Sequence, residues 1–395
     1  MKYPVVILHP GREQSVTRRH QWIFSQAIRK KDKALADGDI VSVSDVNGKI
    51  IATAHYQDRS LALRILDFGD TIIDSTFWTR KLTSALAYRR SLGLVQSPAT
   101  NAFRLVHGEG DELPGLIVDI YDRIAVLQAH SIGMFRQRHQ IADSLMQLDG
   151  MDILGVFDKS AEVLKTDADE MNDPQWLTGS GKERVTILEN GIQFSVDIAQ
   201  GQKTGFFLDQ RLNRMFVQEH SSAKSVLNCF CYTGGFSMYA LAGRAKHVTS
   251  VDSSGPALAI LQENLQLNGF AERHEAIQAD VLPFLTQSHD LFDLVICDPP
   301  AFAKSMHKRH NAVQAYKRLN VLALKHVKPG GMLFTFSCSQ VVDRQLFYDT
   351  IVAAAIEAGR PARVIFETSQ APDHPVSVFH PEGSYLKGLA LYLEN

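Results

Sequence analysis

From Ser225 to its end, the chain alternates regularly between apolar strand-like segments and helical stretches, and this alternation constrains the fold more than any other feature. Strands rich in Val, Ile and Leu and separated by helices are typical of a mostly parallel sheet that is covered on both faces. The expected strands lie in seven segments: 225–230, 247–252, 274–280, 292–298, 331–339, 362–370 and 386–394. We therefore predict a doubly wound α/β domain over residues 188–395, with ligands bound beyond the carboxyl ends of its strands.

The chain ahead of this domain has a different pattern. Residues 1–74 contain short alternating runs with an Asn47-Gly48 turn, which predicts hairpins of a small β-barrel, and one amphipathic helix is expected near residues 18–28. Residues 75–187 begin with a helical period and continue as strands and a further helix, which predicts a central α+β domain. A hairpin with Asn190-Gly191 at its tip leads into the α/β domain.

The distribution of charge indicates a polyanionic partner although the net charge is only −2. Residues 1–33 carry eight Lys and Arg against two acids, and residues 299–342 carry seven basic residues and no acid. Two separate basic zones suit a nucleic acid that is held at two places, whereas either zone alone could be a solvated surface. The RNA contacts that we expect are Arg18, Arg19, Lys304, Lys308 and Arg309.

Cellular location and metal content follow from two simpler features. The apolar runs are far shorter than a membrane helix or a signal peptide requires, so we expect a cytoplasmic protein. The four cysteines do not have the two-pair spacing of a zinc site, so we expect reduced thiols and no metal.

A glycine-containing turn and two acids indicate the cofactor. Gly234 and Gly235 follow the first strand, Asp252 ends the second strand 18 residues after Gly234, and Asp280 ends the third. The first acid is placed to accept hydrogen bonds from ribose hydroxyls and the second to meet an adenine edge. The chain has no phosphate-binding glycine motif, which favours an adenosine without phosphates, S-adenosylmethionine, although both acids could simply cap helices. The cofactor contacts that we expect around these strand ends are Asn228, Phe230, Thr233, Gly234, Gly235, Asp252, Ser253, Asp280, Val281, Asp298 and Pro299.

The fourth and fifth strands supply a candidate catalytic pair. Asp298 precedes Pro299 and Pro300, which cannot continue a central strand and therefore form a rigid turn. Cys338 ends the fifth strand, so an acid and a thiol face the same cleft. A thiolate adds to C6 of a pyrimidine and makes C5 nucleophilic, and Asp298 could hydrogen-bond the N3/N4 edge of cytosine. We interpret Cys297 as a core residue because it points to the opposite face from Asp298.

Several sequence strings resemble a known family over essentially the whole chain. GQKTGFFLDQRLNR (201–214), LNCFCYTGGFS, CDPPAFAK, FSCS and PEGSYLKG are similar to segments of the ribosomal RNA large subunit methyltransferase I family. The resemblance implies an N-terminal PUA domain, a central domain, a seven-stranded class I methyltransferase domain, and 5-methylcytosine formation in 23S rRNA. It also implies that Cys338 is the nucleophile and that Phe206, Asp209, Gln210 and Arg211 lie over the methionine end of the cofactor.

Two other functions stay open at this point. An amino-group methyltransferase acting on adenine or guanine shares the acid-Pro-Pro turn, but Ala301 separates that turn from the aromatic Phe302. A ribosome assembly factor that keeps a methyltransferase fold without using the cofactor is the other alternative. The expected partner is 23S rRNA or a large-subunit assembly intermediate, with the protein a monomer or a homodimer.

In two-cysteine RNA cytosine methyltransferases a second thiol follows the Asp-Pro pair. Pro300-Ala301 stands at that place in this chain, so another base must remove the C5 proton.

Overall fold

The computed structural model describes residues 3–164, 174–303 and 305–394, which fall into two compact units. The first unit comprises Met1–Gly191, Val196–Leu208 and Pro372–Gly383, and the second comprises Ile192–Ser195, Asp209–Ala371 and Ser384–Asn395. A short segment near the end of the chain, Pro372–Gly383, therefore belongs with the N-terminal half. The finer division at residues 74 and 187 stays a prediction.

The N-terminal part of the first unit is a six-stranded sheet with the order β2-β6-β5-β4-β1-β3. Its strands are β1 (Val5–Leu8), β2 (Trp22–Phe24), β3 (Ile28–Lys30), β4 (Ile40–Ser44), β5 (Ile50–Tyr56) and β6 (Leu61–Asp67). Asn47-Gly48 lies between β4 and β5, as predicted. The helix expected near residues 18–28 is wrong, since β2 and β3 occupy that segment and the helix α1 covers only Gln14–Thr17. Pairing of β2 with β6 satisfies the backbone there and overrides the apparent helical period.

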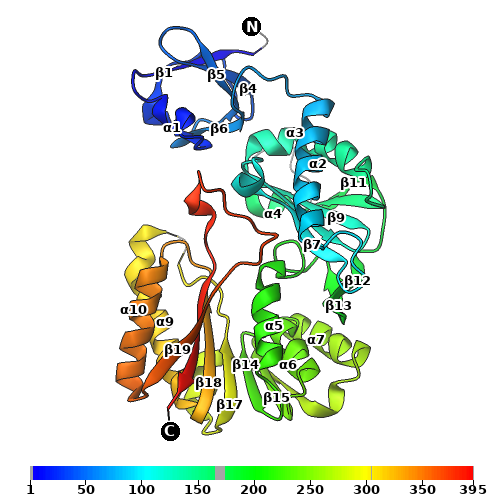
Figure 1. The fold of residues 1–395 in the computed structure, drawn as a ribbon, viewed down its shortest axis with the longest axis vertical. Coiled ribbons are helices and arrows are strands. Elements are labelled where there is room, and N and C mark those ends of the chain that lie inside the picture. Colours follow the sequence, from blue (N-terminus) through cyan, green and yellow to red (C-terminus); the bar gives the residue numbers. More distant parts are fainter. Residues whose placement is uncertain (1–2, 165–173, 304, 395) are drawn as a thin grey trace. The chain divides into compact units, whose positions relative to one another are not determined.

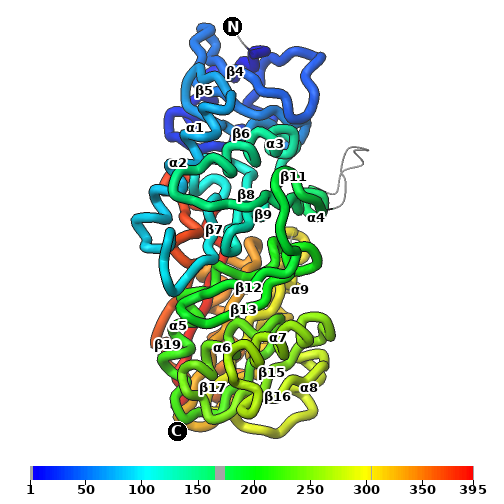
Figure 2. Tube along the Cα trace, turned by 90° about the vertical axis from the view of Figure 1, so that its right-hand side faces the viewer, coloured from blue at the N-terminus to red at the C-terminus, as the bar shows by residue number. Residues whose placement is uncertain are grey.

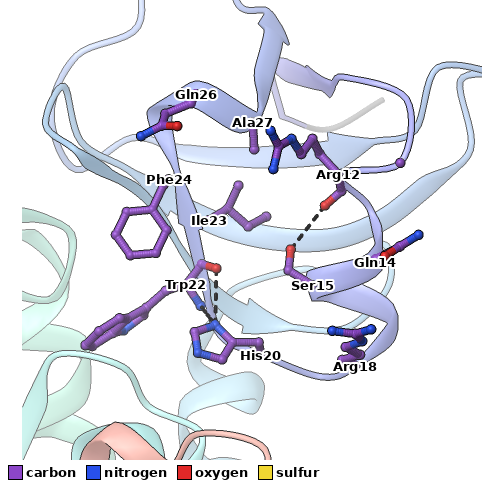
Figure 3. A pocket seen from close by; sticks show the side chains of 11 residues that line it. Arg12, Gln14, Ser15, Arg18, His20, Trp22, Ile23, Phe24, Gln26 and Ala27 are labelled. Atoms are coloured by element: carbon purple, nitrogen blue, oxygen red, sulfur yellow. Dashed lines mark hydrogen bonds between the residues drawn. The ribbon is translucent and has the colours of Figure 1, made fainter.

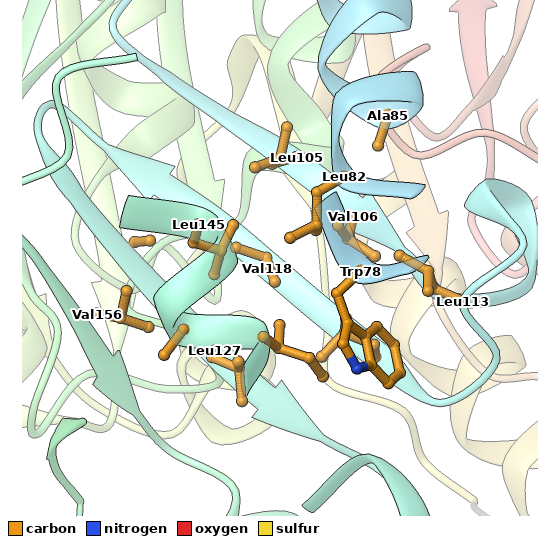
Figure 4. Close-up of a cluster of buried hydrophobic side chains, with 14 of the residues drawn as sticks. Trp78, Leu82, Ala85, Leu105, Val106, Leu113, Val118, Leu127, Leu145 and Val156 are labelled. Carbon is orange, nitrogen blue, oxygen red and sulfur yellow. The ribbon is translucent and has the colours of Figure 1, made fainter. Parts of the chain in front are cut away.

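The central part of the first unit packs helices on a five-stranded sheet with the order β11-β10-β9-β8-β7. The strands are β7 (Ala102–His107), β8 (Leu116–Tyr121), β9 (Ile124–Ala129), β10 (Gly155–Asp158) and β11 (Gln175–Gly179). The helices are α2 (Ser75–Ser91), α3 (Ile132–Met146) and the short α4 (Ala161–Leu164). Asp74 caps α2 by accepting from the Phe77 N–H, and Ser131 caps α3 through Met134. Apolar side chains of α2 and α3, including Trp78 and Leu145, pack over Val118 and Leu127 of the sheet (Figure 4).

A two-stranded hairpin links this region to the second unit. Its strands are β12 (Arg184–Glu189) and β13 (Ile192–Asp197), which run side by side in Figure 2. Asn190 and Gly191 form the tip with φ angles of 52° and 81°, the left-handed conformations that a tight hairpin turn requires. The hairpin predicted from the sequence is therefore confirmed.

The second unit holds a seven-stranded sheet with the order β16-β15-β14-β17-β18-β20-β19. Its strands are β14 (Ser225–Cys229), β15 (His247–Asp252), β16 (His274–Gln278), β17 (Phe292–Cys297), β18 (Val327–Ser337), β19 (Ala362–Ser369) and β20 (Lys387–Leu393). The first five strands are parallel, and β20 runs antiparallel to both of its neighbours. The prediction of a mostly parallel, doubly wound domain is confirmed.

Helices cover both faces of this sheet, as Figure 1 shows. They are α5 (Arg211–Glu219), α6 (Gly235–Ala242), α7 (Gly255–Leu267), α8 (Val281–Gln287), α9 (Arg309–Lys325) and α10 (Arg344–Ala358). Buried residues of α8, α9 and α10 share one apolar core with β14, β17 and β18. Within the described ranges, no helix has both the length and the apolar character needed to cross a bilayer.

Candidate cofactor and catalytic site

The polar residues predicted from the sequence meet at one edge of the seven-stranded sheet. Because β14 to β18 are parallel, their carboxyl ends lie at the same edge, where a doubly wound domain binds its ligands. The turn after β14, Asp252 at the end of β15, Asp280 after β16 and Asp298 after β17 all lie there. Cys338 follows β18 directly and completes the row.

The turn between β14 and α6 has an unusual backbone. Phe230, Tyr232 and Gly234 have φ angles of 58°, 49° and 83°, and the left-handed region costs a non-glycine residue about 1–2 kcal/mol. The carboxylate of Asp252 compensates by accepting hydrogen bonds from the Tyr232 N–H at 2.8 Å and the Ser254 N–H at 2.9 Å. Such strain is concentrated at functional sites, where surrounding contacts hold it in place.

Gly234 brings this turn against α7. A Cβ at Gly234 would lie 2.9 Å from Cγ of Leu261, so only glycine fits without a shift. Buried Asn264 of α7 fixes the same turn by donating to the Thr233 carbonyl oxygen at 2.9 Å, while its own Oδ1 accepts from the Ser195 N–H at 2.7 Å. The turn is therefore held from two sides.

Two buried oxygens near this turn have no hydrogen-bond donor among the described residues: Oγ1 of Thr233 and Oδ1 of Asn228. A buried oxygen without a donor costs free energy, which a ligand with N–H or O–H groups can recover. Asp252 is half-buried and its oxygens can accept further bonds. The hydroxyls and ammonium of S-adenosylmethionine supply such donors, so the residues fit this cofactor.

Asp280 and its neighbours occupy the end of β16. Asp280 is exposed and precedes α8, but its side chain makes no capping hydrogen bond to that helix. The capping alternative therefore fails for Asp280, and its role in cofactor binding stays a prediction. Val281 is buried in the apolar core, and Ser253, after β15, is exposed with its carbonyl oxygen accepting from Gln278 at 3.3 Å.

The segment before α5 joins this edge through buried side chains. Asp209, Gln210 and Arg211 are at most 5 % exposed, and Asp209 accepts a hydrogen bond from the Tyr385 hydroxyl at 2.6 Å. Nε2 of Gln210 donates to Oδ2 of Asp298 at 3.0 Å. Phe206 belongs to the first unit, where its backbone exchanges hydrogen bonds with the Tyr121 hydroxyl.

The candidate catalytic pair lies on two loops that are joined by a hydrogen bond. Asp298 and Cys338 are both half-buried, and the hydroxyl of Ser339 donates to the Ala303 carbonyl oxygen at 2.8 Å. Both groups influence Tyr316 of α9 electrostatically. Burial makes the largest contribution to the raised pKa of its phenol, and the charges of Cys338 and Asp298 raise this pKa further.

The other three cysteines are buried. Cys229 and Cys297 are opposite each other in β14 and β17, and a hydrogen bond with Cys297 together with burial raises the pKa of the Cys229 thiol. This confirms Cys297 as a core residue.

Lys387 is a candidate functional residue that the sequence reasoning missed. It begins β20 opposite Ser337 of β18, is 5 % exposed, and its Nζ donates to the Ser339 carbonyl oxygen at 2.7 Å. Burial lowers the pKa of Lys387 to about 8, and the charge of Cys338 opposes that shift. Only the pairing of β20 with β18 brings this lysine to Cys338, so no local sequence pattern could have identified it.

The side chains predicted to contact RNA differ in their exposure and in whether they already form an ion pair. Arg18 and Lys308 are exposed, whereas Arg309 pairs with Asp343 at 3.0 Å. Arg19 pairs with Glu112 at 3.4 Å and lies over the Phe68 ring, 4.6 Å from its centre. Lys304 lies outside the described residues.

A cavity of about 380 Å³ opens in the N-terminal module, the part of the first unit that holds β1 to β6. Its lining residues come from the stretch between β1 and β3: Gly11, Arg12, Gln14, Ser15, Arg18, His20, Trp22, Ile23, Phe24, Gln26 and Ala27. Figure 3 shows Arg12 and Arg18 on one side of it and the rings of Phe24 and Trp22 on the other.

Comparison with known proteins supports the fold and the cofactor. Residues 105–368 match the model of the S-adenosylmethionine-dependent methyltransferase family, and residues 6–68 match a PUA-like domain. Ribosomal RNA large subunit methyltransferase I of Alteromonas mediterranea is 40% identical over 391 residues, 97% of each chain. The protein of the same name from Pseudoalteromonas translucida is 39% identical over 97% of this chain and 98% of its own.

A solved structure shares the fold over nearly its whole length. It is a putative SAM-dependent methyltransferase from Streptococcus mutans, which is 22% identical, covers 98% of this chain and 99% of its own, and has a TM-score of 0.84. S-adenosylmethionine is the cofactor of the family whose model covers the candidate site. By the identity and coverage of its relatives, this chain belongs to the ribosomal RNA large subunit methyltransferase I family of S-adenosylmethionine-dependent methyltransferases.

Proposed function

We propose that the protein methylates C5 of a cytosine in 23S rRNA through a covalent bond between Cys338 and C6 of the base. The observation that carries this proposal is the position of Cys338 at the cofactor edge, on a loop hydrogen-bonded to the one that begins with Asp298. The relatives' names supply the ribosomal RNA of the large subunit as the substrate. An rRNA substrate also implies action in the cytoplasm.

Each residue of the pair has a distinct role in this reaction. The Cys338 thiolate forms a bond to C6, and the electrons of the C5–C6 double bond move to C5. Asp298 hydrogen-bonds the N3/N4 edge of the cytosine and stabilises the charge that the addition creates. When S-adenosylmethionine is bound, its sulfonium supplies the methyl group that C5 takes. A base then removes the C5 proton, the C5–C6 double bond re-forms, and Cys338 leaves as a thiolate.

Lys387 supports the thiolate in this scheme. Its ammonium is held beside the Cys338 loop by the hydrogen bond to Ser339, and a cation near a thiol favours the thiolate form, which is the reactive one. Lys387 acts through Cys338 and is therefore a positioning residue.

The exposed basic side chains provide the electrostatic part of RNA binding. Arg18 and Lys308 form no ion pair with the described residues, so they can approach phosphates without losing one. The target cytosine must leave its stack to reach Cys338. Arg309 would first have to separate from Asp343.

Trapping with 5-fluorocytosine RNA tests the chemistry. Fluorine at C5 cannot leave as a cation, so the wild-type protein should remain covalently bound to the RNA after methyl transfer. Cys338→Ala should bind S-adenosylmethionine normally but form no adduct and no 5-methylcytosine. Cys297→Ala should form the adduct and 5-methylcytosine as the wild type does. Methylation by Cys338→Ala would exclude thiol addition and favour an amino-group methyltransferase. A wild-type protein that does not bind the cofactor would favour the assembly role.

A further inference from the structure

Three potential metal ligands converge in the first unit, whereas the residues proposed for methyl transfer belong to the second. His20 precedes β2, while His380 and Glu382 belong to Pro372–Gly383, where Pro381–Gly383 forms a 3₁₀ turn. Nε2 of His20 lies 3.3 Å from Oε1 of Glu382, and Nδ1 of His380 lies 3.8 Å from Oε2 of the same carboxylate. The three side chains each offer a ligand atom within 4.8 Å of the others.

The environment of His380 indicates a binding site for a ligand. The residue is 1 % exposed, and its Nδ1 has no hydrogen-bond partner among the described residues. Its separation of 3.8 Å from Glu382 is too long for a hydrogen bond. A buried ring nitrogen without a partner is costly, and a metal ion bound by its lone pair would remove that cost.

The second ring nitrogen of His20 has backbone partners on Trp22. The Trp22 N–H donates to Nδ1 of His20 at 3.2 Å, and in that tautomer Nε2 carries the proton and donates to Oε1 of Glu382 at 3.3 Å. A metal ion at Nε2 would replace this proton, and Nδ1 could then donate to the Trp22 carbonyl oxygen, which lies 3.3 Å away, as histidine ligands usually do. Figure 3 shows His20 and Trp22 joined in this way beside the cavity.

The Trp22 side chain holds the second imidazole. Its ring packs edge-on against His380, with 4.3 Å between the ring centres, and its Nε1 donates to Oε1 of Glu109 at 2.7 Å. His20 and His380 are themselves 4.7 Å apart between ring centres. Both imidazoles are therefore oriented before any ion arrives.

We propose that His20, His380 and Glu382 bind a divalent transition-metal ion of the Zn²⁺ class. With ligand bonds of 2.0–2.1 Å, tetrahedral geometry places neighbouring ligand atoms about 3.4 Å apart. Nε2 of His20 lies 3.3 Å from Oε1 of Glu382 and Nδ1 of His380 lies 3.8 Å from Oε2, so each imidazole is near this spacing from one oxygen of the carboxylate. Two imidazoles and one carboxylate suit Zn²⁺, Co²⁺ or Ni²⁺, whereas Ca²⁺ and Mg²⁺ prefer oxygen ligands alone. The Glu382 side chain is 48% exposed, which leaves a fourth position open to water.

The ion would join two distant segments of the chain. Residue 20 lies in the N-terminal module, and residues 380 and 382 lie in the segment that returns to the first unit from the end of the sequence. A metal that binds only the folded protein stabilises it by mass action. The site would therefore fix Pro372–Gly383 to the N-terminal module.

Cobalt titration of the full-length protein, freed of any affinity tag and of bound metal, tests the site. We expect one Co²⁺ per chain, the visible absorption of a tetrahedral N/O site without a thiolate band, and displacement by Zn²⁺. Glu382→Gln, His380→Asn and His20→Gln should each weaken binding at least about 100-fold, more than loss of an outer partner usually does. His289→Gln, which removes an exposed histidine elsewhere, should bind as the wild type does.

Two results would overturn the proposal. One is the absence of stoichiometric Co²⁺ binding, and the other is unchanged affinity in Glu382→Gln. Because Glu382 is largely exposed, that variant should fold, and equal metal-free melting temperatures would exclude a folding defect. A thiolate-to-cobalt absorption band would also contradict the proposed ligands, since it would place the ion on cysteine.

Discussion

Gln210 donates a hydrogen bond from Nε2 to Oδ2 of Asp298 at 3.0 Å, and so orients the carboxylate that follows β17. Gln210 is itself fixed, because the amide of Asn213 donates to its Oε1. Asn213 also donates to the Ser369 carbonyl oxygen at the end of β19. One oxygen of the Asp298 carboxylate is therefore held by two linked side-chain amides that are anchored to the end of the edge strand β19.

Replacing Gln210 with Glu should impair methyl transfer, because two carboxylates would then face each other and Asp298 would be pushed toward its protonated form. Hydrogen bonds to charged groups contribute about 1.5–3 kcal/mol, so kcat/KM should fall roughly 10–100-fold. Steady-state kinetics over a pH series would measure both the loss and the shift of the profile. Gln266→Glu, an exposed change of the same charge on α7, should leave the rate unaltered. Equal losses in both variants would mean that added charge, not the contact with Asp298, is responsible.

Replacing Lys387 with Met should move the acidic limb of the pH profile of kcat/KM to higher pH. Without the neighbouring ammonium, a higher pH is needed to form the Cys338 thiolate. Lys387→Arg keeps the charge at every accessible pH and should restore the limb toward its wild-type position. A uniform loss of rate in Lys387→Met with an unshifted limb would show that the lysine only supports the fold.

The strands and most of the candidate site residues could be predicted from the sequence, because each of these residues directly follows the apolar run that forms its strand. Asp252, Asp280, Asp298 and Cys338 follow apolar runs directly, and parallel pairing then brings them to one edge. Lys387 could not be found in this way, since its position depends on antiparallel pairing between β18 and β20.

The metal ligands of the first unit were missed for a related reason. The expectation of no metal rested on cysteine spacing, whereas the proposed ligands are His20, His380 and Glu382, and Glu382 comes 362 positions after His20 in the sequence. Such a separation leaves no spacing pattern in the sequence. The strand β2 illustrates the same limit, because its pairing with β6 decides a segment whose periodicity suggested a helix.

Lys308 should contribute to RNA affinity more than Arg309. Lys308 is exposed, whereas Arg309 pairs with Asp343 and must exchange that partner for a phosphate. Loss of one phosphate contact should reduce the slope of log affinity against log salt by about 1, which Lys308→Ala should show. Filter-binding or anisotropy titrations across a salt series would measure it. A slope that is the same in Lys308→Ala and the wild type would exclude this phosphate contact.

Breaking the buried Arg89–Asp111 pair should destabilise the first unit strongly. Arg89 is fully buried, donates bidentately to Asp111, and also donates to the carbonyl oxygens of Arg104 and Asp373, each at 2.7 Å. Removal of one partner from a buried pair costs about 3–5 kcal/mol, because the other charge is left uncompensated. Asp111→Ala should therefore lower the denaturant midpoint far more than Asp143→Ala, a change at an exposed position of α3. Similar midpoints for the two variants would contradict this role of the pair.

His55 should make the protein sensitive to acid. Its ring is buried in the N-terminal module against Gly133, and neither ring nitrogen has a partner among the described residues. Burial, followed by the charges of Arg64 and Arg136, lowers the pKa of His55 to about 3 from 6.5. Between these values the unfolded chain binds a proton that the folded protein excludes, so stability is lost as the pH falls below 6.5.

The contribution of this single proton is roughly 1.4 kcal/mol per pH unit well below pH 6.5. Thermal melting between pH 7 and pH 4 should therefore show a smaller decrease in melting temperature for His55→Leu than for the wild type. His130 and His274, whose pKa values burial lowers to about 4, remain in both proteins, so the difference between them isolates His55. His289→Gln removes an exposed ring and should follow the wild-type curve. If His55→Leu loses stability on acidification as steeply as the wild type does, a neutral buried His55 is not the cause of the acid sensitivity.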